Sequence, residues 1–241
     1  DGPWKKQLIE GFYHDGSLLF DEDGRNYIVY GNDEIWITEL NEDLTAPKKD
    51  GLHRLLVSDH KNPELGYEGS HIQKINGYYY IFLVHSLRDR WMRTEACFYS
   101  DSLEGEFTGG DVLCDDRGYC GQGVAQGGIV DTPDGKWYAM LFQDSVAVGR
   151  IPILLPVSLK DHFPFFGQNG HVPEEIEVHS TRPGYIYQPL VGSDDFCNGL
   201  LPRWQFNHDP DPRYYHLDAL QGTYTITTRE VCTELTQAVN T

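Results

Sequence analysis

A chain of 241 residues is long enough for one large domain or two small ones, and 39% hydrophobic with 23% charged residues favours a folded protein over a disordered one. Acidic residues outnumber basic ones by 37 to 19, which gives a formal net charge of −18. This charge argues against nucleic acid or an anionic membrane as a partner, because both need a basic face. A neutral, sugar-like ligand is compatible with it.

Three segments in chain order share one plan: a short strand, a turn that ends in glycine, and a second strand rich in aromatic residues. They are "HDGSLLFDEDGRNYIVYG" from residue 14, "YEGSHIQKINGYYYIFLV" from residue 67 and "AQGGIVDTPDGKWYAMLF" from residue 125. Asn-Gly and Asp-Gly between strand-like runs are the strongest short-range signals of a β-hairpin. We therefore expect hairpins that turn at Gly24, Gly77 and Gly135.

A further strand-like run follows each hairpin, namely "EIWITEL", "ACFYSD" and "RIPILLPV". The turn glycines are 53 and 58 residues apart, and repeats of about this length, with four strands each, are typical of β-propeller blades. Apolar residues do not recur with the period of a helix over any sustained window. The sequence therefore predicts an all-β propeller.

The cysteines and the apolar runs give weaker evidence about the class of protein and its compartment. The five cysteines form no CxxC pair, so neither a full disulfide framework nor a zinc site is indicated, although one bridge from Cys114 to Cys120 stays open. No stretch approaches the roughly 20 apolar residues that a bilayer crossing needs, and the first residues do not resemble a signal peptide. The compartment, secreted or cytoplasmic, stays open.

One polar residue lies nine positions before each turn glycine and is itself followed by glycine: Asp15, Glu68 and Gln126. Because the innermost strands of a propeller surround one central channel, we expect these equivalent positions to converge. Glycoside hydrolysis needs two carboxyl groups in one cleft, one protonated to donate to the leaving oxygen and one ionised to activate water. The alternative is that these are strand-end residues that accept turn or cap hydrogen bonds.

These segments, together with "VGRIPILLPV" from residue 148, resemble glycoside hydrolase family 43, the five-bladed β-propeller enzymes that act on arabinoxylan and related plant polysaccharides. The resemblance implies that Glu68 is the general acid. It implies that Asp15 tunes this acid and orients the sugar, although Gly16 stands where the family usually has proline. It also implies a substrate contact for Arg150, whose guanidinium suits vicinal hydroxyls; a surface ion pair is the alternative.

Three more residues are candidates for contacting a saccharide. Gln126 would line the same channel as a polar sugar contact. His71 follows Glu68 closely in the chain, and a hydrogen-bonded channel residue is its alternative role. Trp91, in "SLRDRWMRTEA", could lie on a loop and stack on a sugar ring.

The third acid of the family, the general base, has no match in this chain. In the family it lies on the innermost strand of the first blade, upstream of the segment that matches "HDGS", and residues 1–11 resemble only the outer end of such a blade. We therefore expect the base to come from an upstream segment, so that the partner of this chain would be the rest of its own longer polypeptide.

The stretch from Leu201, "LPRWQFNHDPDPRYYHLDALQGTYTITTRE", resembles the opening of the β-sandwich that follows the propeller in many family members. We expect an incomplete five-bladed propeller, from part of the first blade to the fifth, over residues 1–198 and the beginning of a sandwich over residues 199–241. Many members also bind calcium on the propeller axis through a histidine, where this chain has Ala125-Gln126. No cofactor is expected to be required, and a structural calcium ion is left unassigned.

The resemblance thus implies an inverting, exo-acting glycoside hydrolase that releases arabinofuranose or xylose from arabinoxylan-type saccharides. Pocket depth decides between the two sugars, so arabinofuranosidase and xylosidase both stay open. The alternative function is a propeller that binds saccharide without catalysis, since no base is matched.

Overall fold

The computed structural model describes residues 6–178, 180, 182–186, 192–201, 204–206, 211–228, 231 and 234. The chain divides into one compact unit over residues 1–178 and a second over residues 179–241. The domain boundary predicted from the sequence, between residues 198 and 199, lies inside the second unit. Residues 1–5, part of the segment interpreted as the end of a first blade, lie outside the described residues.

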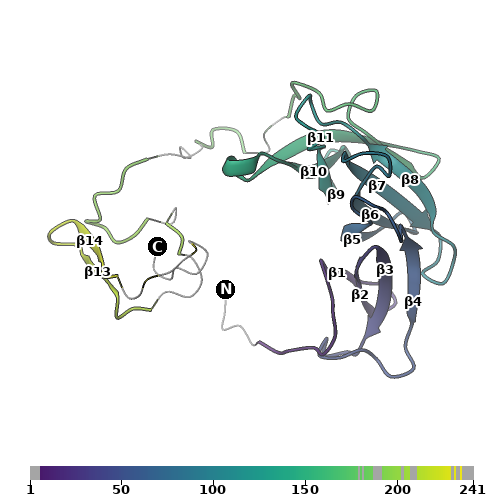
Figure 1. The fold of residues 1–241 in the computed structure, drawn as a ribbon, viewed down its shortest axis with the longest axis horizontal. Helices are drawn as coiled ribbons and strands as arrows, with labels where there is room; N and C mark the ends of the chain where they lie inside the picture. Colours follow the sequence, from purple (N-terminus) through teal and green to yellow (C-terminus); the bar gives the residue numbers. More distant parts are fainter. Residues whose placement is uncertain are drawn as a thin grey trace. The chain divides into compact units, whose positions relative to one another are not determined.

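In the described part of the first unit, twelve strands form three four-stranded antiparallel sheets (Figure 1), and within each sheet the strands pair in chain order. This up-and-down order is that of a propeller blade. The strands are β1 (Ser17–Phe20), β2 (Asn26–Asn32), β3 (Glu34–Leu40), β4 (His53–Ser58), β5 (Glu68–Ile75), β6 (Tyr78–Ser86), β7 (Arg93–Ser100), β8 (Thr108–Leu113), β9 (Ala125–Asp131), β10 (Trp137–Asp144), β11 (Arg150–Lys160) and β12 (Phe163–Phe166).

The three predicted hairpins are confirmed. They join β1 to β2, β5 to β6 and β9 to β10, and turn at Gly24, Gly77 and Gly135, whose φ angles of 82°, 83° and 79° suit glycine. The predicted all-β class is confirmed as well: the described residues contain only a single helical turn, Val146–Val148. Among them, no helix has the length and apolar character that a membrane crossing requires.

The middle sheet is buried on both faces, and strand β6 shows why. Successive side chains of a strand point to opposite faces, so Ile81 and Leu83 enter one buried cluster with residues of β2 and β3, while Tyr80 and Phe82 enter a second cluster with residues of β9, β10 and β11. In Figure 1, β1, β5 and β9 lie together on one side of this unit, and β4 and β8 lie on the other. The heads of the three first strands are thereby brought close to one another.

The described residues of the second unit include a two-stranded antiparallel sheet, β13 (Tyr215–Asp218) paired with β14 (Thr223–Ile226). The rings of Tyr215 and Tyr224 pack with Phe206, at centroid distances of 5.4 and 6.5 Å. The beginning of a β-sandwich over residues 199–241 stays a prediction.

The bridge left open between Cys114 and Cys120 is not formed, because both cysteines are free. The Cys114 thiol instead accepts a hydrogen bond from the Thr94 hydroxyl, at 3.5 Å. Cys232 lies outside the described residues.

Candidate active site

His14 bridges the two carboxylates nominated from the sequence. Its Nε2 atom lies 3.4 Å from Oε2 of Glu68 and 3.5 Å from Oδ2 of Asp15. The side chains of Glu68 and Asp15 are 22% and 37% exposed, so a substrate can reach both. The structure therefore places Asp15 and Glu68 in one cluster, as the shared spacing predicts.

The heads of β5 and β9 depart from regular strand pairing. Glu68 pairs with Val84, but the next pair is His71 with Phe82, so β5 carries a bulge directly after Glu68. At Gly69, which has a φ of 65°, a Cβ atom would lie 2.7 Å from Cγ of Gln126. Glycine after the acid thus permits the close approach of Gln126 from the neighbouring blade.

A residue that sequence reasoning missed, Asn32, holds the Glu68 carboxylate. The Asn32 Nδ2 atom donates a hydrogen bond to Oε2 of Glu68 at 3.0 Å. Asn32 is the last residue of β2, 36 positions away from its partner, and no spacing rule in the hairpin pattern connects the two. Only the packing of the first sheet on the second reveals the contact.

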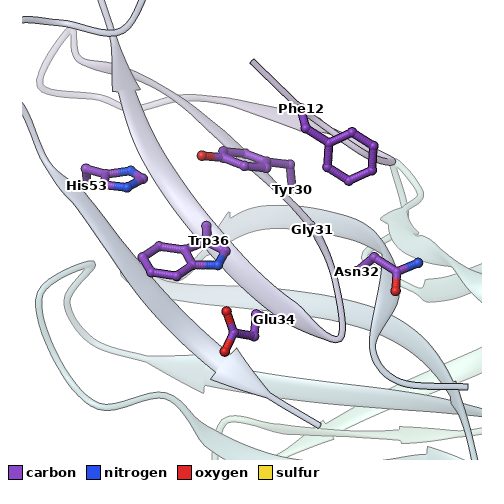
Figure 2. A pocket seen from close by; sticks show the side chains of 7 residues that line it. All are labelled: Phe12, Tyr30, Gly31, Asn32, Glu34, Trp36 and His53. Carbon is purple, nitrogen blue, oxygen red and sulfur yellow. The ribbon is translucent and has the colours of Figure 1, made fainter. Parts of the chain in front are cut away.

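Asn32 also lines a pocket of about 270 Å³ on the first sheet (Figure 2). The rings of Trp36 and His53 stack there, with centroids 5.2 Å apart and an interplanar angle of 14°. Aromatic faces of this kind are suitable surfaces for stacking. The lining residues are Phe12, Tyr30, Gly31, Asn32, Glu34, Trp36 and His53.

Gln126 is held by two groups of the middle sheet. Its backbone N–H donates to Oε2 of Glu95 at 2.6 Å, and its Oε1 accepts from Nη2 of the buried Arg93 at 3.5 Å. This geometry bears on the calcium ion that the family resemblance implies. A cation beside the Gln126 oxygen would face the Arg93 guanidinium, so these residues do not fit calcium at this position.

The cluster of His14, Asp15 and Glu68 is the other candidate for a metal among the described residues, since one possible ligand atom from each lies within 4.8 Å of the others. Oε2 of Glu68 already accepts from Asn32 and lies beside His14. We assign no metal to these residues.

Glu95 is completely buried, and burial raises its pKa well above the ordinary value, against the opposing effects of the Gln126 N–H and of Arg93. Among the residues that the structure describes, none forms a hydrogen bond with its Oε1 atom. A neutral carboxyl group is the form that such a site favours.

Replacing Glu95 by Gln is expected to flatten the pH dependence of stability. The folded state keeps on Glu95 a proton that the unfolded chain releases above about pH 4.3. Glu95 therefore favours folding most below that pH, and the free energy of unfolding falls as the pH rises toward the folded pKa. Glutamine cannot titrate. The thermal midpoint of Glu95→Gln should change less than that of the wild type between about pH 5 and pH 8; parallel curves would contradict a buried neutral Glu95.

Arg150 begins β11 and has a side chain that is 64% exposed. Its Nε lies 3.5 Å from Oδ1 of Asp144, and its guanidinium carbon lies 4.5 Å from the centre of the Phe142 ring. Arg93 also approaches both groups, with Nη1 3.3 Å from Oδ2 of Asp144. The ion pair considered as an alternative for Arg150 is therefore present, and a substrate contact stays a prediction.

The remaining two candidates lie in different settings. His71, on β5, lies beside Gly128 of β9, where an added Cβ atom would be 3.6 Å from the His71 ring. Desolvation lowers the pKa of His71, although the charge of Asp15 opposes this shift. Trp91 lies in the loop between β6 and β7, with an exposed side chain, and stays a prediction as a stacking surface for sugar.

Blade-like sheets with a pair of carboxylates at the heads of their first strands are the features of a propeller glycoside hydrolase. The model of the glycosyl hydrolases family 43 matches residues 1–164. The chain belongs to this family, which confirms the resemblance found in the sequence and the propeller fold.

Several solved and curated proteins are similar to this chain. The structure of a bifunctional GH43-CE protein from Bacteroides eggerthii is 40% identical, with a TM-score of 0.81, over 98% of this chain and 31% of that one. An engineered GH43 glycoside hydrolase with endo-xylanase and exo-arabinofuranosidase activity is 27% identical, with a TM-score of 0.77, over 98% of this chain and 45% of that one. A β-xylosidase from Formosa agariphila is 25% identical over 92% of this chain. The chain spans 43% of the length of the curated relatives it matches.

Proposed function

We propose that this chain carries the general acid of an inverting exo-glycoside hydrolase that releases arabinofuranose or xylose from arabinoxylan-type saccharides. The observation that carries the proposal is the cluster at the strand heads, where His14 lies within 3.5 Å of both carboxylates. Family membership supports glycosidase chemistry. The β-xylosidase and exo-arabinofuranosidase activities of similar proteins support the choice of pentose substrates.

In the proposed reaction, Glu68 gives its proton to the glycosidic oxygen as the bond from that oxygen to the anomeric carbon breaks, and the bonding electron pair leaves with the oxygen. A carboxylate base takes a proton from the water that attacks the opposite face of the sugar. Inverting pairs of carboxyl groups lie about 6.5–9.5 Å apart to leave room for this water. Asp15 has an oxygen within 4.8 Å of Glu68, so we assign it to orienting the sugar and tuning the acid.

We therefore propose that the base comes from a segment of the longer polypeptide outside this chain. The test is hydrolysis of aryl α-L-arabinofuranoside and aryl β-xyloside by the complete polypeptide, with the first-formed anomer identified by proton NMR. Inversion is expected. Retention of the anomeric configuration would contradict the proposal. It would mean that the reaction passes through a covalent glycosyl-enzyme intermediate, which two carboxyl groups as close as those of Asp15 and Glu68 can support.

A saccharide-binding propeller without catalysis is the second candidate, favoured by the aromatic pocket beside Asn32. Calorimetric titration of the complete polypeptide with xylo- and arabino-oligosaccharides separates the two functions. Binding without any turnover would favour this second candidate.

Replacing Asp15 by Asn is expected to lower kcat on both aryl glycosides, because Asn keeps the shape of the side chain but replaces a carboxylate oxygen that lies within 4.8 Å of Glu68. Initial rates of the complete polypeptide on the aryl α-L-arabinofuranoside and the aryl β-xyloside measure the loss. Rates equal to those of the wild type would remove Asp15 from the proposed site.

A further inference from the structure

The two carboxyl oxygens of Glu68 lie in different surroundings. In the part of the chain that the structure describes, Oε2 accepts the hydrogen bond from the Asn32 amide at 3.0 Å and lies 3.4 Å from Nε2 of His14. An amide N–H can only donate, and the carbonyl oxygen of a protonated carboxyl group is the stronger acceptor of its two oxygens. A proton on Glu68 is therefore placed on Oε1.

We propose that Asn32 is a positioning residue for the general acid: it fixes Oε2 of Glu68 and leaves Oε1 as the oxygen that delivers the proton. This inference rests on the proposed function. In the transfer step the Oε1–H bond breaks, the proton bonds to the glycosidic oxygen, and that oxygen takes the electron pair from its bond to the anomeric carbon. Negative charge develops on the carboxyl group of Glu68 during this step. The Asn32 donor stabilises that charge, and so lowers the barrier rather than only binding the substrate.

The backbone around Asn32 is tied to the backbone around Glu68. The N–H of Asp33 donates to the carbonyl of Tyr67 at 2.9 Å, and the N–H of Asp59 donates to the carbonyl of Asp33 at 2.9 Å. Asp33, the residue after Asn32, is thus hydrogen-bonded to Tyr67, the residue before Glu68. The first of these hydrogen bonds joins the turn after β2 to the head of β5, and the second ties the same turn to the end of β4.

Gly66 allows this contact between the first and second sheets. A Cβ atom on Gly66 would lie 1.9 Å from Oδ1 and 3.0 Å from Cα of Asp33, so a side chain here would displace the turn that carries Asn32. Tyr67 then packs against His85 and Phe98, with ring centroids 5.0 and 5.3 Å away. The head of β5 is therefore held by the hydrogen bond from Asp33 and by the packing of the Tyr67 ring. A general acid must be held in one orientation to deliver its proton.

The test compares two substrates in the complete polypeptide, an unactivated pentose disaccharide and a 2,4-dinitrophenyl glycoside of the same sugar. Dinitrophenolate leaves without needing a proton, so help given to the acid matters only for the disaccharide. Asn32→Ala should lower kcat for the disaccharide by about tenfold or more, as expected for a lost hydrogen bond to a charged group, with little change for the dinitrophenyl glycoside. Asn32→Leu, which keeps the bulk of the side chain, should show the same loss on the disaccharide and the same small change on the dinitrophenyl glycoside.

Asn26→Ala is the matched control, since Asn26 is the first residue of β2 and lies at the end of that strand away from Asn32. Both rates should be unchanged in it. An equal loss on both substrates in Asn32→Ala and Asn32→Leu would show a structural role alone and overturn the inference, as would no loss on either. If Glu68→Gln loses rate on the disaccharide but not on the dinitrophenyl glycoside, and the Asn32 variants do not, only the inference about Asn32 fails. If Glu68→Gln does not show this difference between the two substrates either, the proposed function fails too.

Discussion

Glu68→Gln is expected to lower kcat on unactivated saccharides by roughly 10³-fold, within the range that a general acid contributes. Glutamine keeps the shape of the side chain and the acceptor for Asn32, but it has no proton to give to the leaving oxygen. A 2,4-dinitrophenyl glycoside, whose leaving group needs no proton, should retain most of its rate. Steady-state kinetics on both substrates with the complete polypeptide measure the difference.

The control for this substitution is Glu64→Gln, at an exposed glutamate shortly before β5. Its rates should match those of the wild type on both substrates. A Glu68→Gln variant that hydrolyses the disaccharide at the wild-type rate would remove Glu68 from the mechanism. A variant that loses both rates equally would show that the carboxylate binds the sugar or supports the fold instead.

The hairpins could be predicted because their signals are local. A glycine with positive φ after Asp or Asn fixes the turn, and the runs on either side have the composition of strands. The polar residues nine positions before Gly24 and Gly77 followed from the same repeat. Their convergence, shown by the contact of His14 with both Asp15 and Glu68, needed only the assumption that the first strands of the blades lie side by side.

The rest of the candidate site depends on contacts between sheets, which carry no local signal. Asn32 is exposed and ends a strand, as many surface residues do, and its bond to Glu68 exists only because Gly66 lets the two sheets approach. Arg93 is buried at the start of β7, because Asp144 and the Phe142 ring lie beside it in the folded chain. Such partners are set by packing in three dimensions rather than by spacing along the chain.

The largest effect on stability is expected from Asp21→Asn, at about 2 kcal/mol at pH 7, a value typical of lost hydrogen bonds to a charged group. Asp21 lies in the turn between β1 and β2 with its side chain 1% exposed. Its Oδ1 accepts from Nζ of Lys74 at 2.6 Å and its Oδ2 accepts from the Tyr79 hydroxyl at 2.5 Å. Both partners belong to the second sheet, so the substitution loosens the first sheet from it.

This loss of stability should depend on pH. Burial acts to raise the pKa of Asp21, but the hydrogen bonds from Lys74 and Tyr79 outweigh burial and lower it. A lowered pKa means that Asp21 stabilises the fold above the unfolded value of about 3.9, and that this stability is lost as the pH falls through the folded pKa. Urea unfolding at pH 7 and at lower pH should show that the gap in the free energy of unfolding between the wild type and Asp21→Asn narrows as the pH falls.

Asp23→Asn, in the same turn but exposed and paired with Arg25, is the control and should leave the contact between sheets intact. A gap that stays constant with pH would mean that Asp21 acts through packing and not through its charge.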